Sequence, residues 1–175
     1  MKKIYGGSDY HFDHFNVIKY DSRPYSNIEE MNEDIIEKHN RIVKPGDDFY
    51  YLGDICFSKN TEFHLKRLNG NKFFIKGNHD TPEIVKLYKK YGNYLGEQCS
   101  HIKIADKRTV LNHFRMMVWN QSHRGAIHFY GHSHGALSHL DTRCQDLYTG
   151  PNNFYPWDLE EQVEILSKKE FIKER

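Results

Sequence analysis

Two histidines in the segment AIHFYGHSHG, residues 126–135, are the first sign of chemistry in this chain. His132 and His134 stand two positions apart between two glycines, directly after an apolar and aromatic run. In an extended segment, side chains two positions apart point to the same side, so both imidazoles can reach one site. Asp9 and His11 have the same spacing, which allows them to share one metal ion.

Other polar residues with ligand chemistry also follow strand-like runs. Such runs cover residues 2–8, 47–53, 72–77, 109–114 and 126–131. Each run ends beside potential ligands, in order Asp9 and His11, Asp54, Asn78 and His79, His113, and His132 with His134. Since ligands of open α/β sheets bind beyond the carboxyl ends of strands, we expect the five segments to converge on one edge. A single HxH or GNHD sequence also fits an ordinary turn, so the prediction depends on all five together.

Helical segments separate these runs and indicate an α/β fold. Ser26 with Glu29 predicts a capping box at the start of one helix. Further helix starts are predicted at residues 81–82, where threonine precedes proline, and at 158–161. Because there is no internal repeat or long linker, we expect one domain over residues 1–175.

Composition limits the classes of function. The 175 residues carry a formal net charge of +1, which disfavours a dedicated nucleic-acid binder because such proteins present a basic surface. The three cysteines, Cys56, Cys99 and Cys144, are far apart and predict reduced thiols rather than a disulfide framework. We see neither a signal peptide nor a membrane-spanning run, so a cytoplasmic location without membrane contact is expected.

The joint pattern of DYH, GD, GNHD, an isolated histidine and GHSH resembles the calcineurin-like metallophosphoesterase superfamily. Within it, the chain is similar to the small single-domain members of bacteria and bacteriophages. The resemblance extends from GGSDYHFDH to NNFYPWDLEEQ. It implies two packed mixed β-sheets flanked by helices, the four-layer sandwich of that superfamily, with a dimetal site at the strand ends.

The resemblance also implies a role for each candidate residue. It gives seven metal ligands: Asp9, His11 and His134 for the first ion, Asn78, His113 and His132 for the second, and Asp54 as the bridge between them. His79 resembles the catalytic histidine, which contacts the phosphoryl group or protonates the leaving oxygen. Asp80 is expected to orient the imidazole of His79, as carboxylates do for many functional histidines. Asn78 is also a candidate contact for substrate.

The implied reaction is hydrolysis of a phosphomonoester or phosphodiester by in-line attack of a hydroxide that bridges two divalent ions. Imidazole, carboxylate and amide ligands without a thiolate admit Mn, Fe, Zn, Co or Ni, and Mn²⁺ is the metal of choice in vitro. The expected substrate is a small phosphorylated molecule, with nucleotides among the candidates. The oligomeric state is left open.

Several positions allow two interpretations. Arg124, in the sequence SHRG just before the GHSH run, is predicted to contact a phosphate oxygen, although a solvated surface arginine fits equally well. The same alternatives apply to Arg115. His14 fits the rim of the site or an ordinary surface position, and His123 receives no role.

Two other functions remain as alternatives. A nuclease of the same superfamily needs a basic groove or a capping domain, and neither the net charge nor the length offers one. A catalytically silent scaffold would be expected to lose some ligands, whereas this chain carries the full set together with His79.

Overall fold

The strand β2 (Asp48–Tyr51) shows how the sequence builds two hydrophobic layers, because its side chains alternate between the faces of a sheet. The computed structural model describes residues 2–140 and 142–171. In it, Phe49 and Tyr51 pack into an aromatic core, while Tyr50 packs against a second, mainly aliphatic core. The sheet that contains β2 therefore separates two cores.

That sheet has five strands in the order β4-β3-β2-β1-β9. The strands β1 (Ile4–Gly7), β2, β3 (Asn71–Ile75) and β4 (Asn93–Gly96) are parallel, and β9 (Trp157–Asp158) is antiparallel to β1. Parallel pairing brings the carboxyl ends of β1, β2 and β3 to one edge of the sheet. The segments that begin with Asp9, Asp54 and Asn78 consequently leave the sheet side by side.

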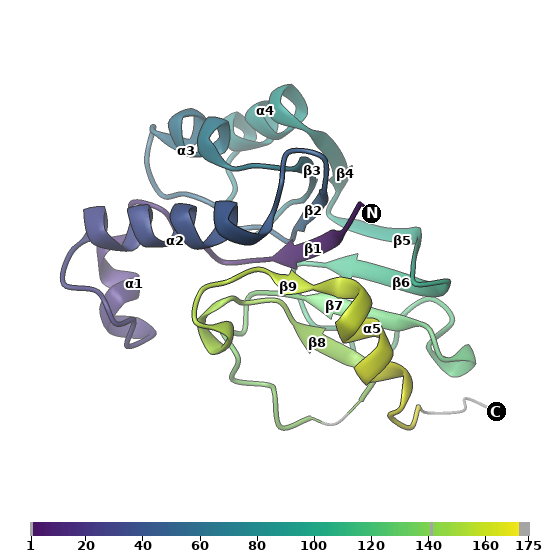
Figure 1. Ribbon diagram of the computed structural model, residues 1–175. Coiled ribbons are helices and arrows are strands. Elements are labelled where there is room, and N and C mark those ends of the chain that lie inside the picture. Colours follow the sequence, from purple (N-terminus) through teal and green to yellow (C-terminus); the bar gives the residue numbers. More distant parts are fainter. Residues whose placement is uncertain (1, 141, 172–175) are drawn as a thin grey trace.

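The second sheet has four strands in the order β5-β6-β7-β8. The strands β5 (Gln98–Ile104) and β6 (Lys107–Asn112) form an antiparallel pair, and β7 (Ile127–Tyr130) and β8 (Cys144–Asp146) continue parallel to β6. Both sheets are thus mixed, and helices flank them (Figure 1). The predicted α/β class with two mixed sheets flanked by helices is confirmed.

Helices cover the outer face of the five-stranded sheet. The helices α2 (Ile28–Ile42), α3 (Thr61–Arg67) and α4 (Pro82–Tyr91) supply apolar side chains to the aromatic core. The short helix α1 (Phe15–Tyr20) precedes them, and α5 (Leu159–Ser167) packs into the second core against β1 and β7. Figure 1 shows α2, α3 and α4 on one side of β1–β3 and the four-stranded sheet on the other.

Two predicted helix starts are confirmed and one is displaced. The Thr81 side chain accepts a hydrogen bond from the Ile84 amide, and the Asp158 side chain caps α5. The capping box predicted at Ser26 lies one residue later, because Asn27 is the N-cap. The Asn27 side chain accepts a hydrogen bond from the Glu30 amide, and the Glu30 carboxylate accepts one from the Ser26 amide.

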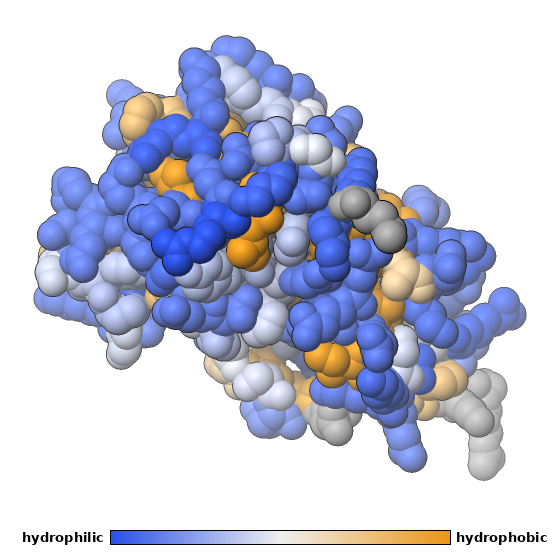
Figure 2. Space-filling view, in the orientation of Figure 1, coloured by the Kyte–Doolittle hydropathy of each residue, from blue (hydrophilic) through white to orange (hydrophobic). Residues whose placement is uncertain are grey.

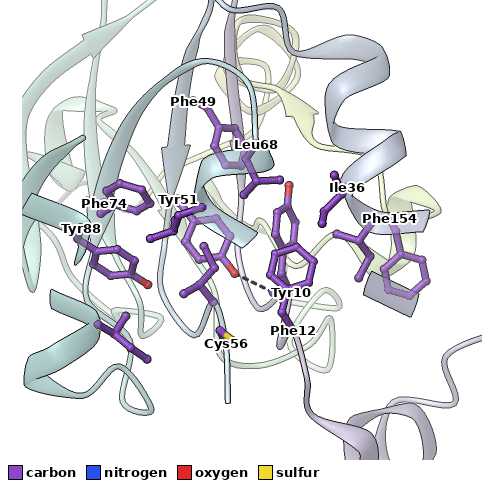
Figure 3. Packing of buried hydrophobic residues seen from close by; sticks show 14 of the residues in the cluster. Tyr10, Phe12, Ile36, Phe49, Tyr51, Cys56, Leu68, Phe74, Tyr88 and Phe154 are labelled. Carbon is purple, nitrogen blue, oxygen red and sulfur yellow. Dashed lines mark hydrogen bonds between the residues drawn. The ribbon is translucent and has the colours of Figure 1, made fainter. Parts of the chain in front are cut away.

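The aromatic core also supports the segments that leave the sheet (Figure 3). Tyr51 is fully buried, and its hydroxyl accepts a hydrogen bond from the Tyr10 amide at 2.8 Å. The same hydroxyl donates to the carbonyl oxygen of Asp54 at 3.2 Å. One core tyrosine therefore fixes the backbone after β1 to the backbone after β2.

The face of the molecule seen in Figure 2 is mainly hydrophilic, with separate small hydrophobic patches. Over the two described ranges, no helix is long and apolar enough to cross a membrane.

Candidate dinuclear metal site

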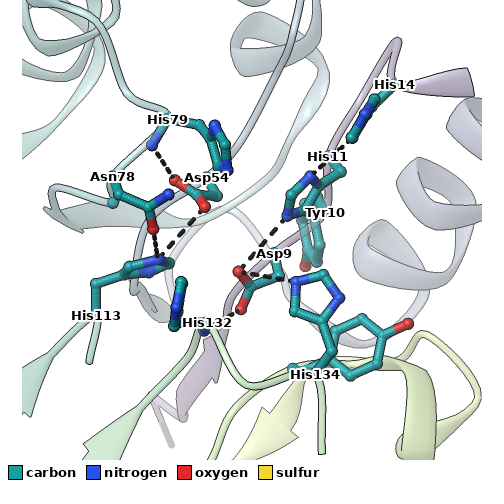
Figure 4. A network of polar contacts seen from close by, with 12 residues as sticks. Asp9, Tyr10, His11, His14, Asp54, Asn78, His79, His113, His132 and His134 are labelled. Carbon is teal, nitrogen blue, oxygen red and sulfur yellow. Dashed lines mark hydrogen bonds and ion pairs between the residues drawn. The ribbon is translucent and has the colours of Figure 1, made fainter. Parts of the chain in front are cut away.

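Two groups of three ligand-type side chains lie at the strand ends, facing one another (Figure 4). In each group, one ligand atom from every residue lies within 4.8 Å of the others. We call them the Asp9 group (Asp9, His11, His134) and the Asp54 group (Asp54, His113, His132). Each group draws its residues from both sheets, so packing the sheets together is what assembles the site.

In the Asp9 group, one buried carboxylate oxygen faces two imidazoles. Asp9 Oδ1 lies 3.6 Å from His11 Nε2 and 3.5 Å from His134 Nε2. The other oxygen, Oδ2, accepts a hydrogen bond from the backbone amide of His132 at 3.0 Å. That bond connects the loop after β1 with the loop after β7.

An outer shell of polar side chains orients His134. Its Nδ1 donates to Asp21 Oδ2 at 2.6 Å, which directs Nε2 towards Asp9. Asp21 in turn accepts from the guanidinium of Arg23 and from the hydroxyl of Tyr148. Arg23 also donates to the carbonyl oxygens of residues 9 and 10, so it supports the Asp9 loop directly. The sequence analysis did not identify Asp21, because no local spacing connects it to a histidine 113 positions away.

In the Asp54 group, backbone atoms provide most of the support. Asp54 Oδ1 accepts from the His79 amide at 2.8 Å, and Oδ2 lies 3.3 Å from His113 Nε2. His113 Nδ1 donates to the Leu52 carbonyl at 2.7 Å, and Asn78 Oδ1 lies 2.9 Å from His113 Nε2. In the neutral ring, Nε2 then carries a lone pair. Three acceptor atoms, Asp54 Oδ2, His113 Nε2 and Asn78 Oδ1, therefore lie close together where a cation would fit.

The candidate ligands have an unusual backbone conformation. Five of them have positive φ angles, between 46° and 67°: Asp9, His11, Asp54, His132 and His134. Left-handed backbone is uncommon outside glycine, and its clustering is typical of functional sites. The expected extended geometry of the DxH and HxH pairs is therefore wrong. The pairs still meet at one site, but His132 and His134 turn into different groups.

Glycine allows the loops after β2 and β3 to touch. A Cβ on Gly77 would lie 2.1 Å from Asp54 Oδ1, and one on Gly53, at φ +98°, would lie 2.5 Å from the Gly77 backbone. No other residue fits at this approach. The GD and GNHD sequences thus require glycine because the two loops pack directly against each other.

The structure corrects the role predicted for Asp80. Its buried carboxylate accepts hydrogen bonds from the amides of Gly77, Asp54 and Ile55, at 2.8, 3.1 and 3.3 Å, rather than from the imidazole of His79. Three backbone donors close by compete effectively for the carboxylate because they are already fixed in place. Asp80 therefore positions the Asp54 loop, and burial raises the pKa of its carboxyl group.

Electrostatics couple the acidic and basic members of the site. Burial opposes ionisation of Asp9, but the facing imidazoles of His11 and His134 lower the pKa of its carboxyl group. Burial likewise disfavours charge on His134, yet Asp21 and Asp9 raise its pKa to about 9. Asp54 raises the pKa of His113 to about 8 against the same burial effect. Both imidazoles thus lie in strongly negative surroundings that favour a cation.

Unpartnered atoms show that the donor set fits metal ions. Asp9 Oδ1 and His11 Nε2 are buried and have no hydrogen-bond partner among the residues that the structure describes. Buried polar atoms without partners are costly, and a divalent ion between them would satisfy both. Carboxylate and imidazole donors of this kind suit Mn, Fe, Zn, Co and Ni alike.

The chain is similar in sequence to the uncharacterized protein MJ1445 of Methanocaldococcus jannaschii. The two are 32% identical over 179 residues, which cover 99% of this chain and 96% of that protein. This chain belongs to the family of MJ1445. No family model matches it.

A solved structure supports the fold. The crystal structure of AQ665 from Aquifex aeolicus, described as a protein of unknown function, superposes with a TM-score of 0.76 at 21% identity. The match covers 94% of this chain and all of that one. It shows a shared fold, while the chemistry of the MJ1445 family must be inferred from the site itself.

His79 lies at the mouth of the site. Its ring is exposed, 4.7 Å from the ring of Phe57 and 6.1 Å from that of His11, measured between centroids. His14 also contacts Phe57, on which its ring stacks at 4.0 Å, and its Nδ1 is 3.2 Å from His11 Nδ1. His14 therefore belongs to the rim of the site, the first of its two proposed positions.

The structure places Arg124 away from the site, contrary to the prediction. It lies in the 3-10 helix Ser122–Arg124, before the first residue of β7, whereas the candidate ligands follow the last residue. A loop that precedes a strand in the sequence joins its opposite end, so proximity along the chain was misleading. Arg115 follows His113 on the correct side, but its guanidinium contacts Met117 and Thr142. His123 is exposed in the same 3-10 helix as Arg124.

Proposed function

We propose that this chain is a dimetal-dependent phosphoesterase with the four-layer sandwich fold of the calcineurin-like metallophosphoesterases. The observation that carries the proposal is the pair of facing ligand groups, in which buried acceptor atoms lie without partners. The substrate would be a small phosphomonoester or phosphodiester. The match to AQ665 is consistent with this fold but names no activity.

Each group would hold one divalent ion, with Asn78 as an additional ligand of the Asp54 group and the Asp54 carboxylate shared by both ions. Two such ions would supply Lewis acidity towards the phosphoryl group and would activate water as a nucleophile. Asn78 contributes an oxygen without negative charge, so the site would stay attractive to an anionic ester.

His79 is the protein group best placed to contact the substrate. Its imidazole is exposed while its amide holds Asp54, so the ring is fixed relative to the ligands yet free to meet a phosphate oxygen. As a hydrogen-bond donor it would neutralise developing charge, and as a general acid it would protonate the leaving oxygen. Asp80 assists indirectly, because its carboxylate joins the Gly77 amide, just before this histidine, to the amide of Asp54.

The test is a paired hydrolysis assay. Chelator-stripped protein is reconstituted with Mn²⁺ and given p-nitrophenyl phosphate and bis-p-nitrophenyl phosphate in parallel. We expect Mn²⁺ to restore turnover of at least one ester, and the faster substrate to distinguish phosphatase from phosphodiesterase activity. Binding of Mn²⁺ without cleavage of either ester or of a panel of nucleotides would support a silent scaffold instead.

A further inference from the structure

A third cluster of ligand-type side chains lies behind the candidate dinuclear site. Asp13, Cys56 and His64 each direct one ligand atom to a common point, within 4.8 Å of one another. Asp13 follows His11 by two residues, and Cys56 follows Asp54 by two residues. The two loops pair directly, through the parallel bridge between Phe12 and Cys56.

The spacing of the three atoms suits a shared ion. Asp13 Oδ2 lies 3.8 Å from Cys56 Sγ and 3.1 Å from His64 Nε2. Around a tetrahedral zinc ion, an oxygen at about 2.0 Å and a sulfur at about 2.3 Å lie roughly 3.5 Å apart. An oxygen and a nitrogen would lie about 3.3 Å apart by the same geometry. The observed separations are within a few tenths of an ångström of these values.

The surroundings hold the three side chains in place. Asn32 donates to Asp13 Oδ1 at 2.6 Å, which leaves Oδ2 for the cluster. The His64 ring stacks on Phe12 at 4.5 Å, and its other nitrogen, Nδ1, is buried without a partner. Within the part of the chain that the structure describes, the hydrogen bond of this imidazole goes into the cluster. His64 and Cys56 are 3% and 2% exposed, so water competes little for these atoms.

The sulfur is the weakest point of a purely hydrogen-bonded arrangement. The contacts of Cys56 Sγ with Asp13 and with the carbonyl and hydroxyl of Ser58 are long, at 3.7–3.8 Å. Ser58 also donates to Asp13 Oδ2, so its hydroxyl lies beside the cluster.

We propose that Asp13, Cys56 and His64 bind one thiophilic divalent cation of the zinc class, separate from the two ions of the candidate active site. On binding, the thiol loses its proton to solvent and the ion gains thiolate, imidazole and carboxylate ligands. The ion would tie the loop that carries His11 to the loop that carries Asp54. This inference does not depend on phosphoesterase activity.

Cobalt substitution tests the proposal, because the Asp9 and Asp54 groups contain no cysteine. Metal-stripped full-length protein is titrated with Co²⁺, and the near-ultraviolet thiolate-to-cobalt charge-transfer band is followed. We expect the band to appear in wild type and to be lost in Cys56→Ser. Cys144→Ser is the matched control, since Cys144 is also buried but belongs to none of the ligand groups found among the described residues, and it should keep the band.

Metal content provides the second measurement. At saturating Zn²⁺, Cys56→Ser and His64→Gln should each bind one equivalent less than wild type or Cys144→Ser. Circular dichroism of each variant confirms that it is folded, and the two substitutions remove different ligands. Absence of the charge-transfer band in wild type, or equal zinc content in all folded variants, would mean that the cluster is only a hydrogen-bonded clasp between the loops.

Discussion

The two ligand groups of the candidate site are built alike but supported differently. The Asp9 group is oriented by side chains, through the chain of contacts from His134 to Asp21 and on to Arg23 and Tyr148. The Asp54 group is oriented mainly by the backbone, with the amide of His79 on its carboxylate and the carbonyl of Leu52 on His113.

The groups also differ in exposure. The carboxylate and one histidine of each group are buried. The third member differs, because His134 is half-buried whereas His132 and the neighbouring Asn78 and His79 are exposed. This difference in exposure indicates different roles for the two ions. The Asp9 group would retain its ion firmly, and the Asp54 group would hold the ion that meets the substrate.

The largest effect is expected for Asp54→Asn. If Asp54 is shared, removing its charge should weaken metal binding in both groups and abolish turnover. Asp9→Asn is the comparison, because it should deplete the ion of the Asp9 group alone. Metal content after gel filtration measures both. Loss of a single ion from Asp54→Asn would contradict the bridging role.

The next effect is expected for His79→Ala. Turnover should fall by roughly 10²–10⁴-fold, the usual contribution of a general acid or base, while both ions remain bound. The amide of residue 79 still holds Asp54, which is why metal content should not change. His139→Ala, at an exposed histidine, is the control. Unchanged turnover in folded, metal-loaded His79→Ala would remove His79 from the mechanism.

A smaller and one-sided effect is expected for Asp21→Asn. Loss of an outer partner of a metal-binding histidine typically lowers metal affinity by about 10–100-fold. Competition with a chelator should detect this loss for the Asp9 group only. Asp106→Asn, at an exposed turn between β5 and β6, should leave both affinities unchanged. An equal loss of affinity for both ions in Asp21→Asn would contradict the distinction between side-chain and backbone support.

The smallest effect is expected for Arg124→Ala. Since Arg124 lies at the far end of β7, kcat/KM should stay within about twofold of wild type, as for most surface substitutions. Steady-state kinetics on the faster p-nitrophenyl ester are sufficient. A fall of tenfold or more would return Arg124 to the substrate site.

Much of the site could be predicted from the sequence because its residues follow directly after buried strands. The apolar run before Asp54 and the one before His132 predict both the strands and the place where they end. Parallel pairing then leaves little freedom for the residues that follow. The helix starts at Thr81 and Asp158 were predictable for a similar reason, since capping depends on neighbours within one turn.

The remaining features depend on tertiary contacts. Asp21 is one of 24 acidic residues and is distinguished only by the fold, which brings it to His134. The sequence predicted that Asp80 orients its neighbour His79, but backbone amides of the loop after β2 donate hydrogen bonds to its carboxylate. The left-handed backbone of the ligands had one sequence signal, because Asp and His tolerate positive φ better than most residues.

The most direct test of the dinuclear centre is a crystal structure of Mn²⁺-loaded protein with anomalous scattering from manganese. The account predicts one peak among Asp9, His11 and His134 and a second among Asp54, His113 and His132. The two should lie about 3.5–4 Å apart, with Asp54 between them. A peak in only one of these two groups, or in neither, would contradict the proposed dimetal centre.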